Sequence, residues 1–142
     1  MLATEVTEGE FKGWKTWPEE PFEHDAAGPF YLNEDEKGPV AAFRAQRKHM
    51  NAGGVMHGGC LMTFADFSLF AIAHNGLEGV YGVTIAFNSE FLDGAIEGEY
   101  MEARGELLRQ GRSITFVRGI ITADGRPVLN FSGTIKYRKP KT

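Results

Sequence analysis

Residues 51–75 read NAGGVMHGGCLMTFADFSLFAIAHN, a glycine-rich loop over residues 51–59 followed by a predicted helix from Cys60 to Asn75. A helix at the surface of a protein keeps its apolar side chains on one face. In this stretch they occupy nearly every face: Leu61, Met62, Phe64, Ala65, Phe67, Leu69, Phe70, Ala71, Ile72 and Ala73. The pattern therefore predicts a buried helix, with Asn75-Gly76 as its C-terminal cap.

The sequence on both sides of this helix has the pattern of β-strands. Four strands are predicted after it, over residues 80–92, 98–109, 112–122 and 127–137, and Asp124-Gly125 is a strong hairpin turn between the last two. Before the helix, residues 29–32 and 40–49 are predicted to pair as a hairpin around a turn at residues 33–38. One buried helix with antiparallel strands predicts an α+β fold in which the sheet wraps around the helix.

The composition is that of one globular domain. The 142 residues carry 15 Lys and Arg against 19 Asp and Glu, a formal net charge of −4. This balance differs from the strongly basic one of most nucleic-acid-binding proteins, so no nucleic-acid partner is expected. We expect residues 28–142 to form the domain and residues 1–27 to be an extension packed on it.

Apolar runs and cysteine content bear on the cellular compartment. The longest apolar-rich run, residues 61–73, is short and contains Asp66, so no membrane segment is expected. Residues 1–11 hold three glutamates and lack the basic and apolar regions of a secretory signal. The single cysteine, Cys60, excludes an intrachain disulfide. We therefore expect a cytoplasmic protein.

Asp66 is the first candidate for a chemical role, because it lies in the middle of the apolar helix. A carboxylate in apolar surroundings costs several kcal/mol unless it is paired, hydrogen-bonded or protonated. Burial should raise the pKa of Asp66 and make it a usable acid or base. The alternative is a structural aspartate whose hydrogen bonds order a loop.

Gly58 and Gly59 are the second candidate, because they lie at the start of the helix. The first turn of a helix presents unpaired N–H groups and the positive end of the helix dipole. Glycine allows an acyl group to come close to that backbone, as an oxyanion site requires. The alternative is a glycine-rich turn that only begins the helix.

Asp66 follows Gly58 by eight residues, which separates them by about 12 Å along a helix. Within one chain the two groups are therefore too far apart to act on the same carbonyl. If both act on one bond, one of them comes from a second subunit. The spacing predicts a catalytic homodimer with antiparallel central helices at its interface.

The motif Asn51-x-x-Gly54-x-x-His57-Gly58-Gly59, followed by Asp66, resembles the hotdog-fold acyl-coenzyme A thioesterases of the phenylacetate-pathway and 4-hydroxybenzoyl-coenzyme A type. The resemblance covers roughly residues 28–138. It implies a hotdog fold, dimers that often pair into tetramers, and hydrolysis of acyl-coenzyme A thioesters. This sequence departs from the family where Phe91-Leu92-Asp93-Gly94 replaces the usual Tyr and Pro, which affects the turn and the lining of the acyl pocket.

The resemblance also implies roles for individual residues. The Gly58 N–H would take the oxyanion, and Asp66 of the opposing subunit would activate water or attack as a nucleophile. Asn51 would orient the water or bind the carboxylate, and His57 would fix the loop by hydrogen bonds rather than transfer protons. The hydroxyl residue of the following strand corresponds to Thr84, which would position the water or contact the acyl group, although Thr is also simply common in strands.

The remaining candidates concern the substrate. Coenzyme A is polyanionic, so its nucleotide needs cations, for which the candidates are Arg112, Arg138 and Lys139. Gly59 is expected to approach the acyl group. The walls of the acyl pocket are sought near the helix, among Met62, Phe64, Phe67 and Phe87, which also fit a plain core. Such walls suit aryl, phenylacetyl and medium-chain fatty acyl groups alike.

No metal site and no separate cofactor are expected, since His24, His49, His57 and His74 lie far apart in the sequence. Cys60, in the first turn, is more readily a small core residue than a nucleophile. Two other functions stay open beside the thioesterase. One is a non-catalytic module that binds acyl-coenzyme A, and the other is a hotdog hydratase or dehydratase.

Overall fold

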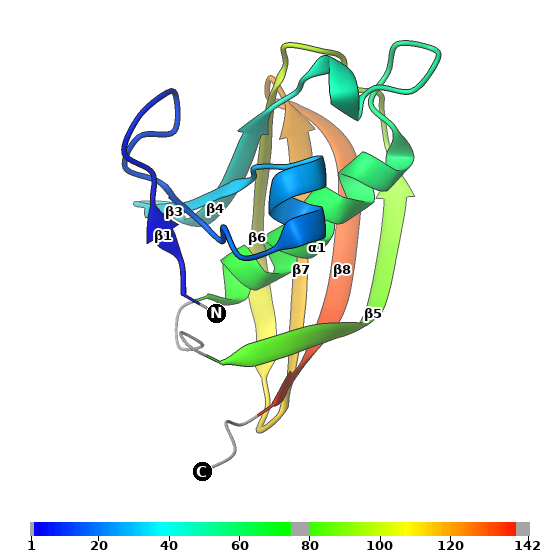
Figure 1. Cartoon of the computed structure of the whole chain (residues 1–142). Helices are drawn as coiled ribbons and strands as arrows, with labels where there is room; N and C mark the ends of the chain where they lie inside the picture. The colour runs from blue at the N-terminus through cyan, green and yellow to red at the C-terminus, as the bar shows by residue number, and fades with distance from the viewer. Residues whose placement is uncertain (1, 75–79, 139–142) are drawn as a thin grey trace.

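The computed structural model describes residues 2–74 and 80–138, which form an antiparallel sheet and a long helix packed on it (Figure 1). The helices are η1 (Pro21–Ala27, a short π-helix), η2 (Arg47–His49, a 3₁₀ turn) and α1 (Gly58–Ala73). The described strands are β1 (Thr4–Glu5), β2 (Lys15–Thr16), β3 (Tyr31–Asp35), β4 (Gly38–Arg44), β5 (Tyr81–Phe91), β6 (Tyr100–Gln110), β7 (Ile114–Ala123) and β8 (Arg126–Arg138).

The strands within the described residues lie in the order β1-β2-β3-β4-β6-β7-β8-β5, and neighbouring strands run antiparallel. The sheet curves around α1, so that α1 contacts β3 through β8 (Figure 1). Along β7 buried and exposed residues alternate: positions 115, 117, 119 and 121 are buried, and positions 116, 118 and 120 between them are exposed. This arrangement confirms the α+β hotdog fold.

Close contact between helix and sheet depends on a glycine in β8. A Cβ atom at Gly133 would lie 2.4 Å from Cδ1 of Leu69, a fully buried residue of α1. Glycine at this position therefore lets α1 lie directly against the sheet. Because nine residues of the helix are buried, from Leu61 to Ala73, the prediction of a buried helix is confirmed.

The four strands predicted after the helix are all present, within two residues of the predicted bounds. The turn between β7 and β8 is the predicted Asp124-Gly125, with φ of 46° and 84°. Positive φ at both central residues is what a two-residue type I′ hairpin turn requires.

The bounds of α1 and of both strands of the first hairpin differ from the prediction. Helix α1 begins at Gly58 rather than Cys60, because His57 caps its first turn, and it ends at Ala73; the predicted cap Asn75-Gly76 lies outside the described residues. The turn of the first hairpin is two residues long, since Asp35 pairs with Gly38 and its Oδ1 accepts the Lys37 N–H at 2.9 Å. Residues 33–35, predicted as part of the turn, lie in β3. The strand predicted over residues 40–49 ends at Arg44, and residues 47–49 form η2 instead.

The N-terminal segment lies against the rest of the chain. Strands β1 and β2 continue the sheet beyond β3, and η1 packs on α1 (Figure 1). Trp17 is buried, with its ring 5.0 Å from that of Phe67, and Trp14 meets the ring of Phe11 edge to face. In the described part of the chain, no helix is long and apolar enough to cross a bilayer.

Candidate active site

Asp66 lies on the side of α1 that faces the beginning of β5. Its Oδ1 accepts a hydrogen bond from Oγ1 of Thr84 at 2.5 Å. The β5–β8 register shifts between Thr84 and Ala86, so a bulge lies next to the hydroxyl that reaches Asp66. The structure therefore brings together two residues that were predicted as catalytic and are 18 positions apart in the sequence.

The surroundings of Asp66 favour its protonated form. Burial raises the pKa of this carboxyl, and the Thr84 hydroxyl opposes that rise by stabilising the charged form. Within the described ranges, no Lys, Arg or His forms an ion pair with Asp66. A carboxylate with a raised pKa and no cationic partner takes up a proton more readily than an ordinary aspartate, as a general base must.

Two hollows meet at Asp66. The first, of about 330 Å³, we call the Trp17 hollow; its lining is Trp17, Glu20, Glu23, Asp66, Phe70, Tyr81, Gly82, Val83 and Thr84. The second, of about 320 Å³, we call the Met62 hollow; its lining is Phe22, Glu23, Gly59, Met62, Thr63, Asp66 and Phe87. Asp66 is therefore accessible from two sides.

The start of α1 keeps one amide available. Nδ1 of His57 accepts the Gly59 N–H at 2.9 Å, and the carbonyl of His57 accepts the N–H groups of Cys60 and Leu61. No acceptor for the Gly58 N–H occurs among residues 2–74 and 80–138. This amide, at the positive end of the helix dipole, is suited to stabilise an oxyanion.

The glycine loop is held by its own side chains. Oδ1 of Asn51 accepts the N–H groups of Gly53 at 2.9 Å and Val55 at 3.3 Å. The carbonyl of His49 accepts the His57 N–H at 2.9 Å. Asn51 and His57 therefore both act on the conformation of the loop, which for His57 is the expected role.

The candidates for the acyl pocket divide between surface and core. Met62 is 41% exposed and lines the Met62 hollow together with Gly59 and Phe87. Phe67 is only 2% exposed; its ring packs on Trp17 and Phe30, and it lines neither hollow at Asp66. Phe64 is likewise in the core. Both rings pack on Phe30, so they belong to the core and not to the lining of the two hollows.

The cationic candidates lie at one end of the sheet. Arg138 pairs with Tyr81 in the β5–β8 ladder, and Tyr81 lines the Trp17 hollow. Arg112 is exposed in the turn between β6 and β7, which is joined to β8 by the Tyr137 N–H bonded to the Ser113 carbonyl at 2.9 Å. Lys139 lies outside the described residues.

Sequence reasoning missed the contribution of the N-terminal segment. Trp17, Glu20 and Glu23 all line the Trp17 hollow, and Phe22 lines the Met62 hollow. Burial, with the neighbouring charges of Glu20 and Asp66, raises the pKa of Glu23 to about 8. No motif or periodicity marks this glutamate among the ten acidic residues of positions 1–38, so only the fold reveals it.

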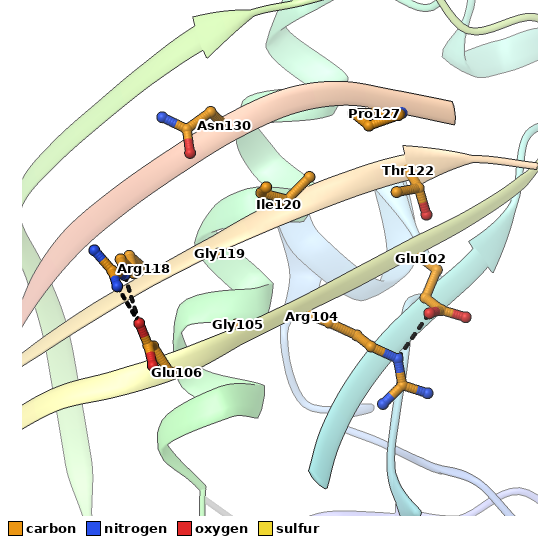
Figure 2. A pocket seen from close by; sticks show the side chains of 10 residues that line it. All are labelled: Glu102, Arg104, Gly105, Glu106, Arg118, Gly119, Ile120, Thr122, Pro127 and Asn130. Carbon is orange, nitrogen blue, oxygen red and sulfur yellow. Dashed lines mark hydrogen bonds and ion pairs between the residues drawn. The ribbon is translucent and has the colours of Figure 1, made fainter. Parts of the chain in front are cut away.

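Three further features lie outside the candidate catalytic set: the Cys60 thiol, a hollow over the sheet, and the question of a metal site. Burial raises the pKa of the Cys60 thiol to about 11, which disfavours the nucleophilic thiolate. A larger hollow, of about 710 Å³, lies over β6, β7 and β8 and holds none of the predicted site residues; Figure 2 shows its lining, in which Arg118 pairs with Glu106 and Arg104 with Glu102. Among the described residues, no three His, Cys, Asp or Glu side chains are grouped as metal ligands.

Strand β5 is an edge of the sheet, and several of its exposed side chains are apolar, beside the polar Asn88 and Glu90. The exposed side chains of this strand include Tyr81, Val83, Ile85 and Phe91. The strand runs antiparallel to α1. Near its beginning Thr84 contacts Asp66 in the middle of the helix, and at its end the Phe91 ring lies 3.2 Å from the Cβ position of Gly58 at the start of the helix. A long apolar edge strand is a surface that natural proteins cover or pair.

Comparison with known proteins gives consistent matches. A family model described as "Thioesterase superfamily" matches residues 53–129. The Pseudomonas aeruginosa protein named "Putative esterase PA0474" is 32% identical over 111 residues, which are 77% of this chain and 83% of that protein.

Solved structures resemble the fold. A hypothetical thioesterase from Streptococcus pneumoniae, solved with coenzyme A, is 23% identical with a TM-score of 0.67, and the match covers 80% of this chain and 91% of that one. A mutant of the phenylacetic acid degradation protein PaaI from Thermus thermophilus is 23% identical with a TM-score of 0.69, and the match covers 84% of this chain and all (100%) of that one.

Proposed function

The chain belongs to the thioesterase superfamily, and on that premise we propose that it hydrolyses acyl-coenzyme A thioesters to the free acid and coenzyme A. The observation that carries the proposal is Asp66, a carboxyl with a raised pKa that is hydrogen-bonded to Thr84 and open to two hollows. The coenzyme A in the Streptococcus pneumoniae structure supports this substrate class.

We propose that the active unit is a homodimer formed along β5. Two β5 strands that pair antiparallel about their middle bring the Thr84 end of one strand beside the Phe91 end of the other. Since Thr84 contacts Asp66 and Phe91 lies against Gly58, Asp66 of one subunit would approach the start of α1 of its partner. The apolar side chains exposed on β5 support this interface. Pairing of dimers into tetramers stays a prediction.

In the proposed reaction the thioester carbonyl oxygen accepts the free N–H of Gly58 from one subunit. Asp66 of the other subunit, as carboxylate, takes a proton from a water molecule whose oxygen attacks the carbonyl carbon. The tetrahedral intermediate then collapses, the carbon–sulfur bond breaks, and coenzyme A leaves. Thr84 holds the Asp66 carboxylate in position for the water, and Asn51 and His57 hold the loop that carries Gly58.

We assign the acyl group to the Met62 hollow, whose walls include Phe22, Met62 and Phe87. The pantetheine arm would then run through the Trp17 hollow toward Tyr81. Arg138, opposite Tyr81 in the ladder, and Arg112, on the neighbouring turn, are described cations at that end of the sheet and would meet the phosphates.

The test measures thiol release from a panel of aryl-, phenylacetyl- and fatty-acyl-coenzyme A esters. We expect release from at least one ester, and a loss of at least about 100-fold in kcat for Asp66→Asn and Asp66→Ala. The variant Asp25→Asn, which changes an exposed aspartate outside both hollows, is the matched control. No release from any ester would favour a binding module, and release that survives both Asp66 substitutions would exclude the assigned base.

A further inference from the structure

Helix η1 holds Glu23 over α1 by contacts at its C-terminal end. Nε2 of His49 bonds the Ala27 carbonyl at 2.7 Å, and Nζ of Lys48 donates to the Gly28 carbonyl at 2.5 Å. The Gly28 N–H donates to the carbonyl of Glu23 itself at 2.7 Å. Because the loop after β4 anchors this end of η1, Glu23 has a defined place beside Asp66.

Glu23 and Asp66 are the two residues that line both the Trp17 hollow and the Met62 hollow. If the acyl group occupies one hollow and the pantetheine arm the other, as the proposed function has it, the thioester bond lies between these two carboxyls. Among the described residues, the Glu23 carboxyl makes no hydrogen bond or ion pair. It is therefore available to a substrate.

Burial, and after it the charges around Glu23, favour the protonated form of this carboxyl. The ionisable side chains that share a hollow with it are Glu20, Asp66 and Tyr81, and no Lys or Arg lines either hollow. Lys48, in the loop that anchors η1, donates to the Gly28 carbonyl. The pKa of Glu23 is about 8, whereas Thr84 stabilises the ionised form of Asp66. Two carboxyls whose environments differ in this way can divide the roles of acid and base.

We propose that Glu23 is the general acid of the reaction and donates its proton to the sulfur of the departing coenzyme A. This inference rests on the proposed function. As the carbon–sulfur bond breaks, its electron pair stays on sulfur, and the Glu23 proton forms the new S–H bond. Asp66 then holds the proton taken from water and Glu23 is ionised. A water molecule then passes the proton from Asp66 to Glu23, which returns Asp66 to the carboxylate and Glu23 to the acid. In the net reaction a thioester and water give a carboxylic acid and a thiol.

The experiment compares two leaving groups in Glu23→Gln. On a benzoyl-coenzyme A ester, or on the best ester of the panel, kcat should fall by at least about 100-fold, the range for loss of a general acid. On the matching S-(4-nitrophenyl) thioester, whose thiolate leaves without a proton, we expect a loss under about fivefold. Retained activity on this second ester also shows that the variant is folded. The exposed neighbour Glu19 gives the control Glu19→Gln, with unchanged rates on both esters.

The pH profile gives a second readout. For the wild type, kcat on the coenzyme A ester should fall at alkaline pH as Glu23 loses its proton, and this limb should be absent from Glu23→Gln. Equal losses on both esters, no loss on either, or an unchanged alkaline limb would each overturn the role of Glu23. If the wild type still turns over the ester and needs Asp66 to do so, any of these results leaves the proposed thioesterase function intact. If the wild type shows no turnover, both the thioesterase function and the role of Glu23 are excluded.

Discussion

Replacing Thr84 by valine removes the hydroxyl that donates to Oδ1 of Asp66 and keeps the shape of the side chain. This hydrogen bond stabilises the ionised carboxylate, so its loss raises the pKa of Asp66 further above its ordinary value. A hydrogen bond to a charged group contributes about 1.5–3 kcal/mol. At 1.36 kcal/mol per pKa unit, we expect a rise of about one to two units.

The assay is the pH dependence of kcat/KM in thiol release. Since Asp66 acts as a base in its ionised form, the acid limb of the profile should move to higher pH in Thr84→Val, by about one to two units. Activity should therefore fall more at low pH than at high pH. Thr84→Ser, which retains the hydroxyl, should leave the limb close to that of the wild type. An acid limb that stays in place in Thr84→Val, or that moves to lower pH, would refute the reasoning.

Three further predictions concern stability and binding. Gly133→Ala should lower the free energy of unfolding by about 1–3 kcal/mol in urea denaturation, because its Cβ would overlap Leu69, and an unchanged value would contradict the close helix–sheet contact. Burial raises the pKa of Glu23 from 4.5 to about 8, so the folded state binds the proton more tightly and wild-type stability should fall as pH rises from about 4.5 to 8. Glu23→Gln should lessen this fall, which denaturation at pH 5 and pH 8 measures. Arg138→Ala should raise KM for coenzyme A esters about 5-fold or more while leaving KM for an N-acetylcysteamine thioester, which lacks the nucleotide, unchanged; equal effects on both would exclude a phosphate contact.

Periodicity and turn chemistry predicted most of the fold. The helix that is apolar on all faces, the strands of period two and the Asp124-Gly125 turn are local signals, and each has a direct physical cause. The start of α1 differs from the prediction because the His57 side chain caps the helix, a contact that propensity does not encode. The short turn after β3 was missed because residues 33–35 are polar and exposed, like the residues of a turn, although they pair with β4.

The candidate site was predicted in part. Asp66 stands out because it interrupts an apolar helix. The hydrogen bond from Thr84 to Asp66 brings these two candidates together, and the contact with water or the acyl group suggested for Thr84 stays a prediction. Glu23 and Trp17 could not be found in this way, because their approach to Asp66 depends on how η1 folds back over α1. Phe67 could not be separated from the pocket residues, since an aromatic side chain on an apolar helix fits a wall and a core equally well.

The central claim is that Asp66 and the Gly58 amide act on one thioester from two subunits, and subunit mixing tests it most directly. Asp66→Asn removes the base, and Gly58→Pro removes the N–H at a first helical position where proline is well tolerated. Gly58→Ala, which keeps the N–H, is the control for the added bulk beside Phe91. Each of the first two variants alone should be inactive.

Co-expression of Asp66→Asn and Gly58→Pro chains with different tags allows the mixed dimer to be isolated. In a mixed dimer one of the two sites combines an intact Asp66 with an intact Gly58 amide, so the account predicts about half of the wild-type thiol release per dimer. A mixed dimer that is isolated intact and releases no thiol would contradict the shared site, as would a Gly58→Pro homodimer with wild-type activity.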